Sequence, residues 1–158
     1  MDLSGRRLES GRLERRHLRV TGVVQGVGFR PFVYGLARRL GIAGLVGNDS
    51  HGVFIELEGQ ADALDAFHAE LIHQPPPLAH IVKVDTETVD ARGDTDFIIV
   101  ESEAQAGAHT LVSPDLAVCD DCLRELFDPA DRRYRYPFIN CTNCGPRFTI
   151  ITDIPYDR

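Results

Sequence analysis

Four cysteines in the last third of the chain have the type and spacing of metal ligands. They form two Cys-x-x-Cys pairs separated by 18 residues: Cys119, Cys122, Cys141 and Cys144. Each two-residue gap lets both sulfurs of a pair reach one tetrahedral ion, and the overall spacing is typical of four-cysteine zinc sites. The pattern predicts a structural Zn²⁺ held by four thiolates. With no open coordination position, such a site is closed and not catalytic.

Three other interpretations of the cysteines remain open. A thioredoxin-like redox site normally needs a single Cys-x-x-Cys pair beside a βαβ unit. Unliganded core thiols would leave about 40 turn-rich residues to fold without a metal. A nucleic-acid-binding zinc ribbon would need a basic surface, whereas residues 119–158 contain six arginines against seven acidic residues. Two matched pairs therefore favour structural zinc.

A second candidate site is a glycine-rich segment near the amino terminus. Its candidate phosphate-binding residues are consecutive: Gln25, Gly26, Val27, Gly28, Phe29 and Arg30. The glycines allow backbone conformations in which successive N–H groups point into one concavity, and a helix beginning at Pro31 adds its positive end. The Arg30 guanidinium can donate two hydrogen bonds to a phosphoryl group. The alternative is an ordinary tight turn between a strand and a helix.

The elements around this loop must bring it to one end of a sheet. Alternating apolar residues predict a first strand from residue 17, and an apolar stripe predicts a helix from Pro31 that Gly41 ends. The same patterns predict further strands over 42–46, 53–58, 82–84 and 97–100, with a second helix over 61–72. The order is βαββαβ with a short extra strand, which is the ferredoxin-like arrangement and gives an α+β fold.

The sequence also predicts the exposure of several acidic side chains and the elements around the cysteines. We expect a solvated face formed by four acidic residues: Glu56, Glu58, Asp62 and Asp65. A short helix is expected over 123–127 after the first cysteine pair. A strand is expected over 134–139 before the second pair.

Composition divides the chain into four parts. Residues 1–16 are polar and Arg-rich, and we expect a flexible arm. The ferredoxin-like domain is expected over 17–101, a linker of small and polar residues over 102–111, and a small zinc-finger domain over 112–158.

Net charge and hydropathy exclude several classes of protein. The 158 residues include 17 basic and 24 acidic side chains, a formal net charge of −7, which argues against nucleic acid as the main partner. No apolar run approaches the roughly 20 residues of a membrane helix, so no membrane partner is expected. Residues 1–16 lack the apolar region of a secretory signal. We therefore expect a cytoplasmic protein.

Two motifs resemble those of a known enzyme family. Residues 21–30, Thr-Gly-Val-Val-Gln-Gly-Val-Gly-Phe-Arg, resemble the acylphosphatase signature, and residues 48–52, Asn-Asp-Ser-His-Gly, resemble the second motif of that family. The resemblance implies that the amides of residues 25–30 and the Arg30 guanidinium bind the phosphate, and that Asn48 holds the attacking water. Such chemistry needs mainly positioning and charge stabilisation, because a carboxylate or carbamate is a good leaving group.

The two halves in this order resemble the amino-terminal part of the HypF carbamoyltransferases, the family that matures nickel–iron hydrogenases. The motifs that carry this resemblance lie over 119–126, 128–134, 136–138 and 140–147. The resemblance implies carbamoyl phosphate as substrate and, in full-length members, a HypE-like acceptor protein. The family's second zinc motif, adenylating domain and transferase domain are not in this sequence, so full carbamoyl transfer is not expected of it alone. The alternatives are a catalytically idle zinc-binding docking fragment and a stand-alone acylphosphatase.

Overall fold

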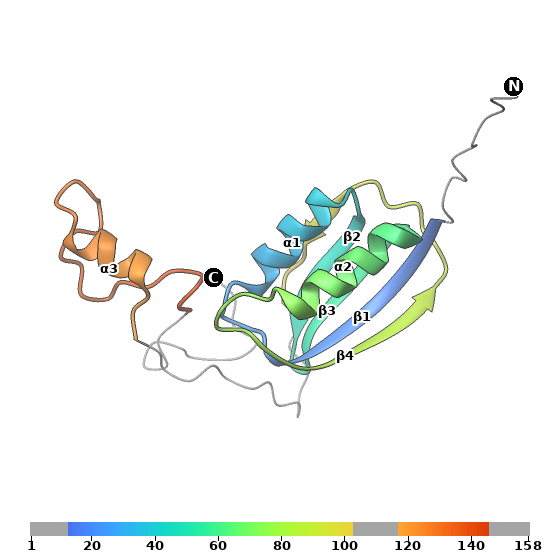
Figure 1. The fold of residues 1–158 in the computed structure, drawn as a ribbon, viewed down its shortest axis with the longest axis horizontal. Coiled ribbons are helices and arrows are strands. Elements are labelled where there is room, and N and C mark those ends of the chain that lie inside the picture. The colour runs from blue at the N-terminus through green and yellow to red at the C-terminus, as the bar shows by residue number, and fades with distance from the viewer. Residues whose placement is uncertain (1–12, 103–116, 146–158) are drawn as a thin grey trace, which may run out of the picture.

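The computed structural model describes residues 13–102 and 117–145. The first of these ranges forms a sheet with two helices packed on one face, and the second contains one short helix (Figure 1). In chain order the elements are β1 (Leu13–Val23), α1 (Phe29–Arg39), β2 (Ala43–Asp49), β3 (Gly52–Gln60), α2 (Ala61–His73), β4 (His80–Val89), β5 (Phe97–Ile99) and α3 (Asp120–Phe127).

The sheet has the strand order β4-β1-β3-β2-β5. The pairs β4–β1, β1–β3 and β3–β2 are antiparallel, and β5 extends the edge at β2 in parallel. The predicted βαββαβ order with a short extra strand is therefore confirmed. This topology places the turn after β1 and the turn after β2 at the same end of the sheet, because β1 and β2 both pair antiparallel to β3.

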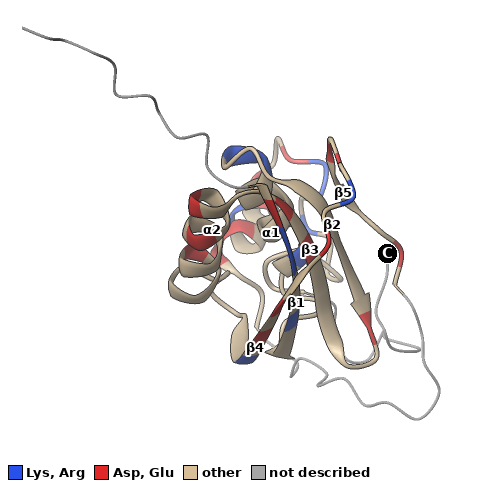
Figure 2. Cartoon of the chain, turned by 90° about the vertical axis from the view of Figure 1, so that its right-hand side faces the viewer, with Lys and Arg blue, Asp and Glu red and all other residues tan. Residues whose placement is uncertain are grey.

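The hydrophobic core lies between the sheet and the two helices. Every second residue of β1 and β3 faces the helices, as in Leu18 and Val20 of β1 and Val53 and Ile55 of β3, all of them fully buried. Figure 2 shows that acidic residues lie on the outer side of α2, away from the sheet. Gly41 follows α1 with a φ of 67°, the left-handed conformation expected of a residue that ends a helix.

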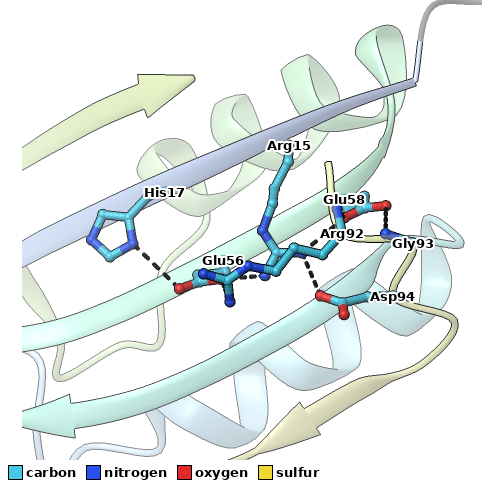
Figure 3. Close-up of polar contacts among 7 residues, drawn as sticks. All are labelled: Arg15, His17, Glu56, Glu58, Arg92, Gly93 and Asp94. Atoms are coloured by element: carbon cyan, nitrogen blue, oxygen red, sulfur yellow. Dashed lines mark hydrogen bonds and ion pairs between the residues drawn. The ribbon is translucent and has the colours of Figure 1, made fainter. Parts of the chain in front are cut away.

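Two predictions, one on the flexible arm and one on the solvated face, are wrong. Residues 13–16 belong to β1, and not to a flexible arm, because Arg15 is buried with 1% of its surface exposed. Its guanidinium forms ion pairs with Glu56, Glu58 and Asp94, which neutralise the buried charge (Figure 3). Glu58 is accordingly 3% exposed and is not part of a solvated face.

Backbone donors complete this ion-pair cluster. The Glu58 carboxylate accepts hydrogen bonds from the N–H groups of Arg92 and Gly93 at 2.8 and 2.7 Å, so it ties the β4–β5 connection to β3. These N–H groups and the Arg15 guanidinium hold the pKa of Glu58 below its ordinary value, against the opposing effect of burial. The cluster therefore stabilises the end of the sheet opposite the glycine-rich loop, where β1 begins and β3 ends.

The cysteine-containing segment folds around α3. The short helix predicted over 123–127 is confirmed, and it begins earlier, at Asp120. The strand predicted over 134–139 is wrong: this segment consists of turns, and Arg135 has a φ of 58°. The Arg135 N–H donates a hydrogen bond to the Leu126 carbonyl of α3 at 2.9 Å, and the guanidinium of the preceding Arg133 donates to the Asn140 carbonyl at 2.6 Å and contacts Glu125.

The remaining expectations on organisation are only partly described. Of the linker predicted over 102–111, the structure describes Ser102, and residues 1–12 lie outside the described ranges. None of the helices in the described ranges is long and apolar enough to cross a membrane.

Candidate active site and metal centre

The glycine-rich loop is anchored by alternate side chains. Val27 and Phe29 are buried in the core at 0% and 2% exposure, whereas Gly26, Gly28 and Arg30 are partly exposed. Gly26 and Gly28 have φ angles of 73° and 75°, and among the described residues Arg135 is the one non-glycine residue with positive φ. Left-handed residues that alternate with ordinary ones turn neighbouring N–H groups toward one side, as in anion-binding nests. The buried side chains hold this arrangement in place.

Gln25 joins the loop to the turn between β2 and β3. Its side-chain nitrogen donates hydrogen bonds to the Asp49 carbonyl at 2.8 Å and to the Gly52 carbonyl at 2.9 Å. Gln25 itself is buried. The two motifs noted in the sequence are therefore brought together in space, and the side chain of Gln25 is a structural tie.

Asn48 lies next to this tie, near the end of β2. It is 1% exposed, and its Oδ1 has no hydrogen-bond partner within residues 13–102 and 117–145. Buried polar atoms are normally satisfied, so an acceptor of this kind usually serves a ligand or an ordered water. The arrangement gives Asn48 an acceptor that can orient a small polar molecule.

Arg30 lies in the first turn of α1. Its guanidinium donates to the Ser102 hydroxyl at 3.4 Å, so the segment after β5 approaches the start of this helix. Gly28 is the N-cap residue of α1 and gives no side-chain cap, which leaves the helix end to backbone and ligand partners. Helix N-termini carry a partial positive charge that favours anions. The loop, the helix end and Arg30 together can stabilise negative charge.

The four cysteine sulfurs converge on one point. All four lie within 4.8 Å of one another, with separations of 3.5 Å for Cys119–Cys141, 3.8 Å for Cys122–Cys144 and 3.9 Å for Cys141–Cys144. A tetrahedron with metal–sulfur bonds of about 2.3 Å has edges of about 3.8 Å. These distances fit one tetrahedral metal ion and are far too long for disulfides.

The thiols of this cluster differ in acidity. Burial raises the pKa of Cys122 and also that of Cys119. Burial acts in the same direction on Cys144, but hydrogen bonds, the first from the Cys141 N–H, outweigh it and lower the pKa of Cys144 to about 6. A metal binds thiolates, so the lowered pKa of Cys144 favours the form that a metal ligand needs.

The metal centre lies against the glycine-rich loop. A methyl group placed on Gly28 would lie 3.2 Å from the Thr142 carbonyl oxygen, and one on Gly145 would lie 2.0 Å from the Gly26 carbonyl oxygen. Leu78, in the α2–β4 connection, packs against both the main core and the small core around Cys122. No sequence pattern predicts the contact between the glycine-rich loop and residues 142–145, because these two segments are more than 110 residues apart.

Sequence reasoning also missed the roles of Ser102 and of the Gln25 side chain. Ser102 lies in a stretch whose composition indicates a linker. Gln25 lies inside a motif for which the sequence predicts a role of the backbone N–H groups and none for its side chain. A glutamine between apolar residues, with Val24 before it and Val27 two positions after it, is the sequence signal that could have identified a buried polar tie.

Comparison with known proteins agrees with both parts of the structure. The family model described as Acylphosphatase matches residues 16–99, and the model described as HypF finger matches residues 118–151. Carbamoyltransferase HypF2 of Cupriavidus necator is 54% identical over 158 residues, which cover 99% of this chain and 20% of that protein. The Salinibacter ruber acylphosphatase is 45% identical over 85 residues, 53% of this chain and 88% of that protein.

Solved structures give the same result. A full-length HypF crystallised in a phosphate- and nucleotide-bound form superposes with a TM-score of 0.87 at 51% identity, covering 92% of this chain and 19% of that one. The Bacillus subtilis acylphosphatase superposes with a TM-score of 0.51 at 35% identity, covering 56% of this chain and 99% of that one. The chain thus spans about one fifth of the length of its HypF relatives. It belongs to the acylphosphatase family over residues 16–99 and, with its finger, is homologous to the amino-terminal region of the HypF carbamoyltransferases.

Proposed function

We propose that residues 13–102 hydrolyse acyl phosphates, with carbamoyl phosphate as the natural substrate. The proposal is supported by the two hydrogen bonds from Gln25 to the Asp49 and Gly52 carbonyls, which join the glycine-rich loop to the turn that follows Asn48. The buried Asn48 Oδ1 has no partner among the described residues. An anion-binding loop and a water-orienting amide at one place are what hydrolysis of an acyl phosphate needs. The carbamoyl group is inferred from the HypF relatives.

The proposed site binds the phosphoryl group through the main chain. The N–H groups of residues 25–30 and the guanidinium of Arg30 would contact its oxygens, with the amino end of α1 behind them. Phosphoryl transfer spreads negative charge over these oxygens in the transition state, so fixed donors stabilise the transition state more than the substrate. No acidic or basic side chain is required to protonate the leaving group.

Asn48 is proposed to orient the attacking water. Its Oδ1 accepts a hydrogen bond from that water, whose oxygen attacks phosphorus while the bond between phosphorus and the carbamate oxygen breaks. The leaving carbamate takes the electron pair of the broken bond, and both protons of the water end on the phosphate. Carbamoyl phosphate dianion and water thus give carbamate and dihydrogen phosphate, each with one negative charge. The amide positions the water and does not act as a strong base.

We also propose that the ion at the four cysteines is Zn²⁺ with a structural role. Four thiolates at tetrahedral separations match zinc and leave no position for a substrate. When bound, the ion supplies folding energy to a segment whose own core is small. The reducing cytoplasm, where thiols stay available for metal, is the compartment that we propose.

In a full-length protein of this type, this region would be the first step of a longer sequence. We propose that the carbamate released here is used by domains beyond this chain to carbamoylate a HypE-like acceptor protein during hydrogenase maturation. This part of the proposal rests on the similarity to carbamoyltransferases over one fifth of their length.

Phosphate release from carbamoyl phosphate and acetyl phosphate tests the proposed activity. Arg30→Ala and Asn48→Ala should abolish most of the release by the metal-loaded chain. Arg38→Ala, which changes an exposed arginine on the same helix, should not. Loss of activity in both site variants supports the proposal. A wild-type chain without phosphate release would instead indicate a zinc-binding docking fragment, and equal rates on small and bulky acyl groups would indicate a general acylphosphatase.

A further inference from the structure

The second cysteine pair and its flanking residues lie directly on the glycine-rich loop. We call residues 141–145 the second knuckle. A methyl group added to Gly28 would lie 3.2 Å from the Thr142 carbonyl oxygen. A methyl group added to Gly145 would lie 2.0 Å from the Gly26 carbonyl oxygen. At both places the backbone of one segment lies against the backbone of the other, so no flexible side chain at these contacts could move to make room. A shift of the second knuckle must therefore move or release the loop.

The contact at Gly26 has a consequence for the adjacent N–H. In a trans peptide the carbonyl oxygen and the following N–H point in opposite directions. A Gly26 oxygen held against Gly145 therefore fixes the direction of the Val27 N–H. Gly26 itself has a φ of 73° and would otherwise be among the most freely rotating residues of the loop. The second knuckle thus restrains one of the donors assigned to the phosphate.

The second knuckle also places polar atoms at the edge of the site. Thr142 and Asn143 are exposed, and Asn143 Oδ1 lies 3.5 Å from the would-be methyl of Gly28. Both residues lie between Cys141 and Cys144, whose sulfurs are 3.9 Å apart, and the Gly145 N–H donates to the Cys141 carbonyl at 2.8 Å. Their positions therefore depend on the closure of the four-cysteine cluster.

The Salinibacter ruber acylphosphatase is too short to contain a segment like residues 117–145 beside its acylphosphatase domain. The 85 residues matched in the Salinibacter ruber acylphosphatase make up 88% of that protein, and what remains is shorter than residues 117–145. In this chain the glycine-rich loop is bordered by the second knuckle.

We propose that the second knuckle is a positioning and specificity element of the acyl-phosphate site. Metal-dependent closure of the four cysteines holds the loop in its phosphate-binding form, and Thr142 and Asn143 border the space for the acyl group, so that small groups such as carbamoyl are favoured over bulky ones. This inference rests on the proposed function, because it concerns selectivity and order at that same site.

Gly145→Ala tests the coupling without removing a metal ligand. Its new methyl group would collide with the Gly26 oxygen, whereas Gly41→Ala adds a methyl at a similar φ, 67° against 71°, with nothing within 4 Å. Both variants should retain one metal ion per chain. Calorimetry with inorganic phosphate should give an affinity at least about tenfold weaker for Gly145→Ala and unchanged for Gly41→Ala. Amide hydrogen exchange over residues 25–30 should be faster in Gly145→Ala alone.

Removal of the metal from the full chain by a chelator is the second experiment. Removal of the metal should weaken phosphate binding and speed exchange over residues 25–30, while the core strands β1 and β3 keep their protection. Unchanged phosphate affinity and exchange after chelation would overturn the coupling even if hydrolysis is normal. A wild-type chain that neither binds phosphate nor hydrolyses acyl phosphates would overturn the proposed function instead.

Selectivity is tested with Asn143→Ala. The ratio of kcat/KM for benzoyl phosphate to that for carbamoyl phosphate should rise roughly tenfold, which is the size of effect that one changed pocket contact produces. Gln74→Ala, an exposed amide after α2, is the control. An unchanged ratio in Asn143→Ala, with full metal content, would show that the second knuckle does not border the acyl group.

Discussion

The side-chain nitrogen of Gln25 donates a hydrogen bond to the carbonyl oxygen of Asp49 at 2.8 Å. This bond connects the loop after β1 to the turn after β2, and the same nitrogen also binds the Gly52 carbonyl at 2.9 Å. Both ends are buried, so water cannot replace the bond at little cost. The relative position of the two motifs therefore depends on one amide.

Gln25→Ala should separate the loop from the turn. We expect the free energy of unfolding to fall by about 1–3 kcal/mol, because two buried carbonyls lose their donor. We expect kcat/KM for acyl phosphates to fall at least about tenfold through misplacement of Asn48. Urea unfolding and steady-state kinetics measure the two effects. A variant with normal kinetics would show that the tie is not needed to align the motifs.

Arg30→Ala should remove a fixed cation from the proposed site. By analogy with the loss of one oxyanion donor, we expect kcat/KM for carbamoyl phosphate to fall at least about 100-fold. Arg30→Lys should recover only part of this loss, because an ammonium group cannot donate in the planar fork of a guanidinium. Arg38→Ala, on an exposed part of the same helix, should stay within about twofold of wild type. Near-normal turnover by a folded Arg30→Ala chain would remove Arg30 from the mechanism.

Glu58 should make stability depend on pH in the acidic range. Its pKa is lower in the folded chain than in the unfolded chain, so its contribution is fully present above the unfolded value of about 4.5 and is lost as pH falls through the lower folded value. Glu58→Gln should therefore flatten the acid side of the stability curve. At pH 7 it should also cost about 1–3 kcal/mol, because Arg15 loses one of its three carboxylate partners and keeps Glu56 and Asp94.

Denaturant melts at several pH values measure this effect. Glu87→Gln, which removes an exposed carboxylate from β4, is the control and should leave the curve close to wild type. An acid limb of unchanged steepness in Glu58→Gln would assign the pH dependence to other carboxylates.

Metal removal should loosen the finger and leave the sheet folded. The small core contains Cys122, Ile139 and Cys144, which are themselves ligands or their neighbours, whereas the main core has 17 buried residues of its own. After chelation we therefore expect amide exchange in α3 to approach that of an unfolded segment while Leu18 and Ile55 remain protected. Simultaneous loss of protection in both parts would show that they fold as one unit.

The sequence by itself determined the fold class, the order of the elements and the four-cysteine cluster. These features depend on local patterns. Apolar residues alternate with polar ones in strands such as β1 and β3, and they form a stripe along α1. Gly28 and Gly41, which are left-handed, lie at the two ends of α1, and the cysteines occur in two Cys-x-x-Cys pairs. Hydrophobic periodicity and ligand spacing are read along the chain, so no long-range contact is needed to infer them. The proposed roles of Arg30 and Asn48 stay predictions for the measurements above.

The tertiary structure alone decided which charged and polar residues are buried and what the finger contacts. The sequence predicts Arg15 in a flexible arm and Glu58 on a solvated face, because hydrophobic periodicity does not show what covers the second face of a sheet. In the structure the β4–β5 connection covers it with Asp94 and two N–H groups. The segment over 134–139 has apolar side chains but forms turns, in which the N–H groups of Tyr134 and Arg135 donate to the Asp131 and Leu126 carbonyls and not to a neighbouring strand. The contact between Gly26 and Gly145 joins residues 119 positions apart, and Leu78 packs against both of the cores on either side of it.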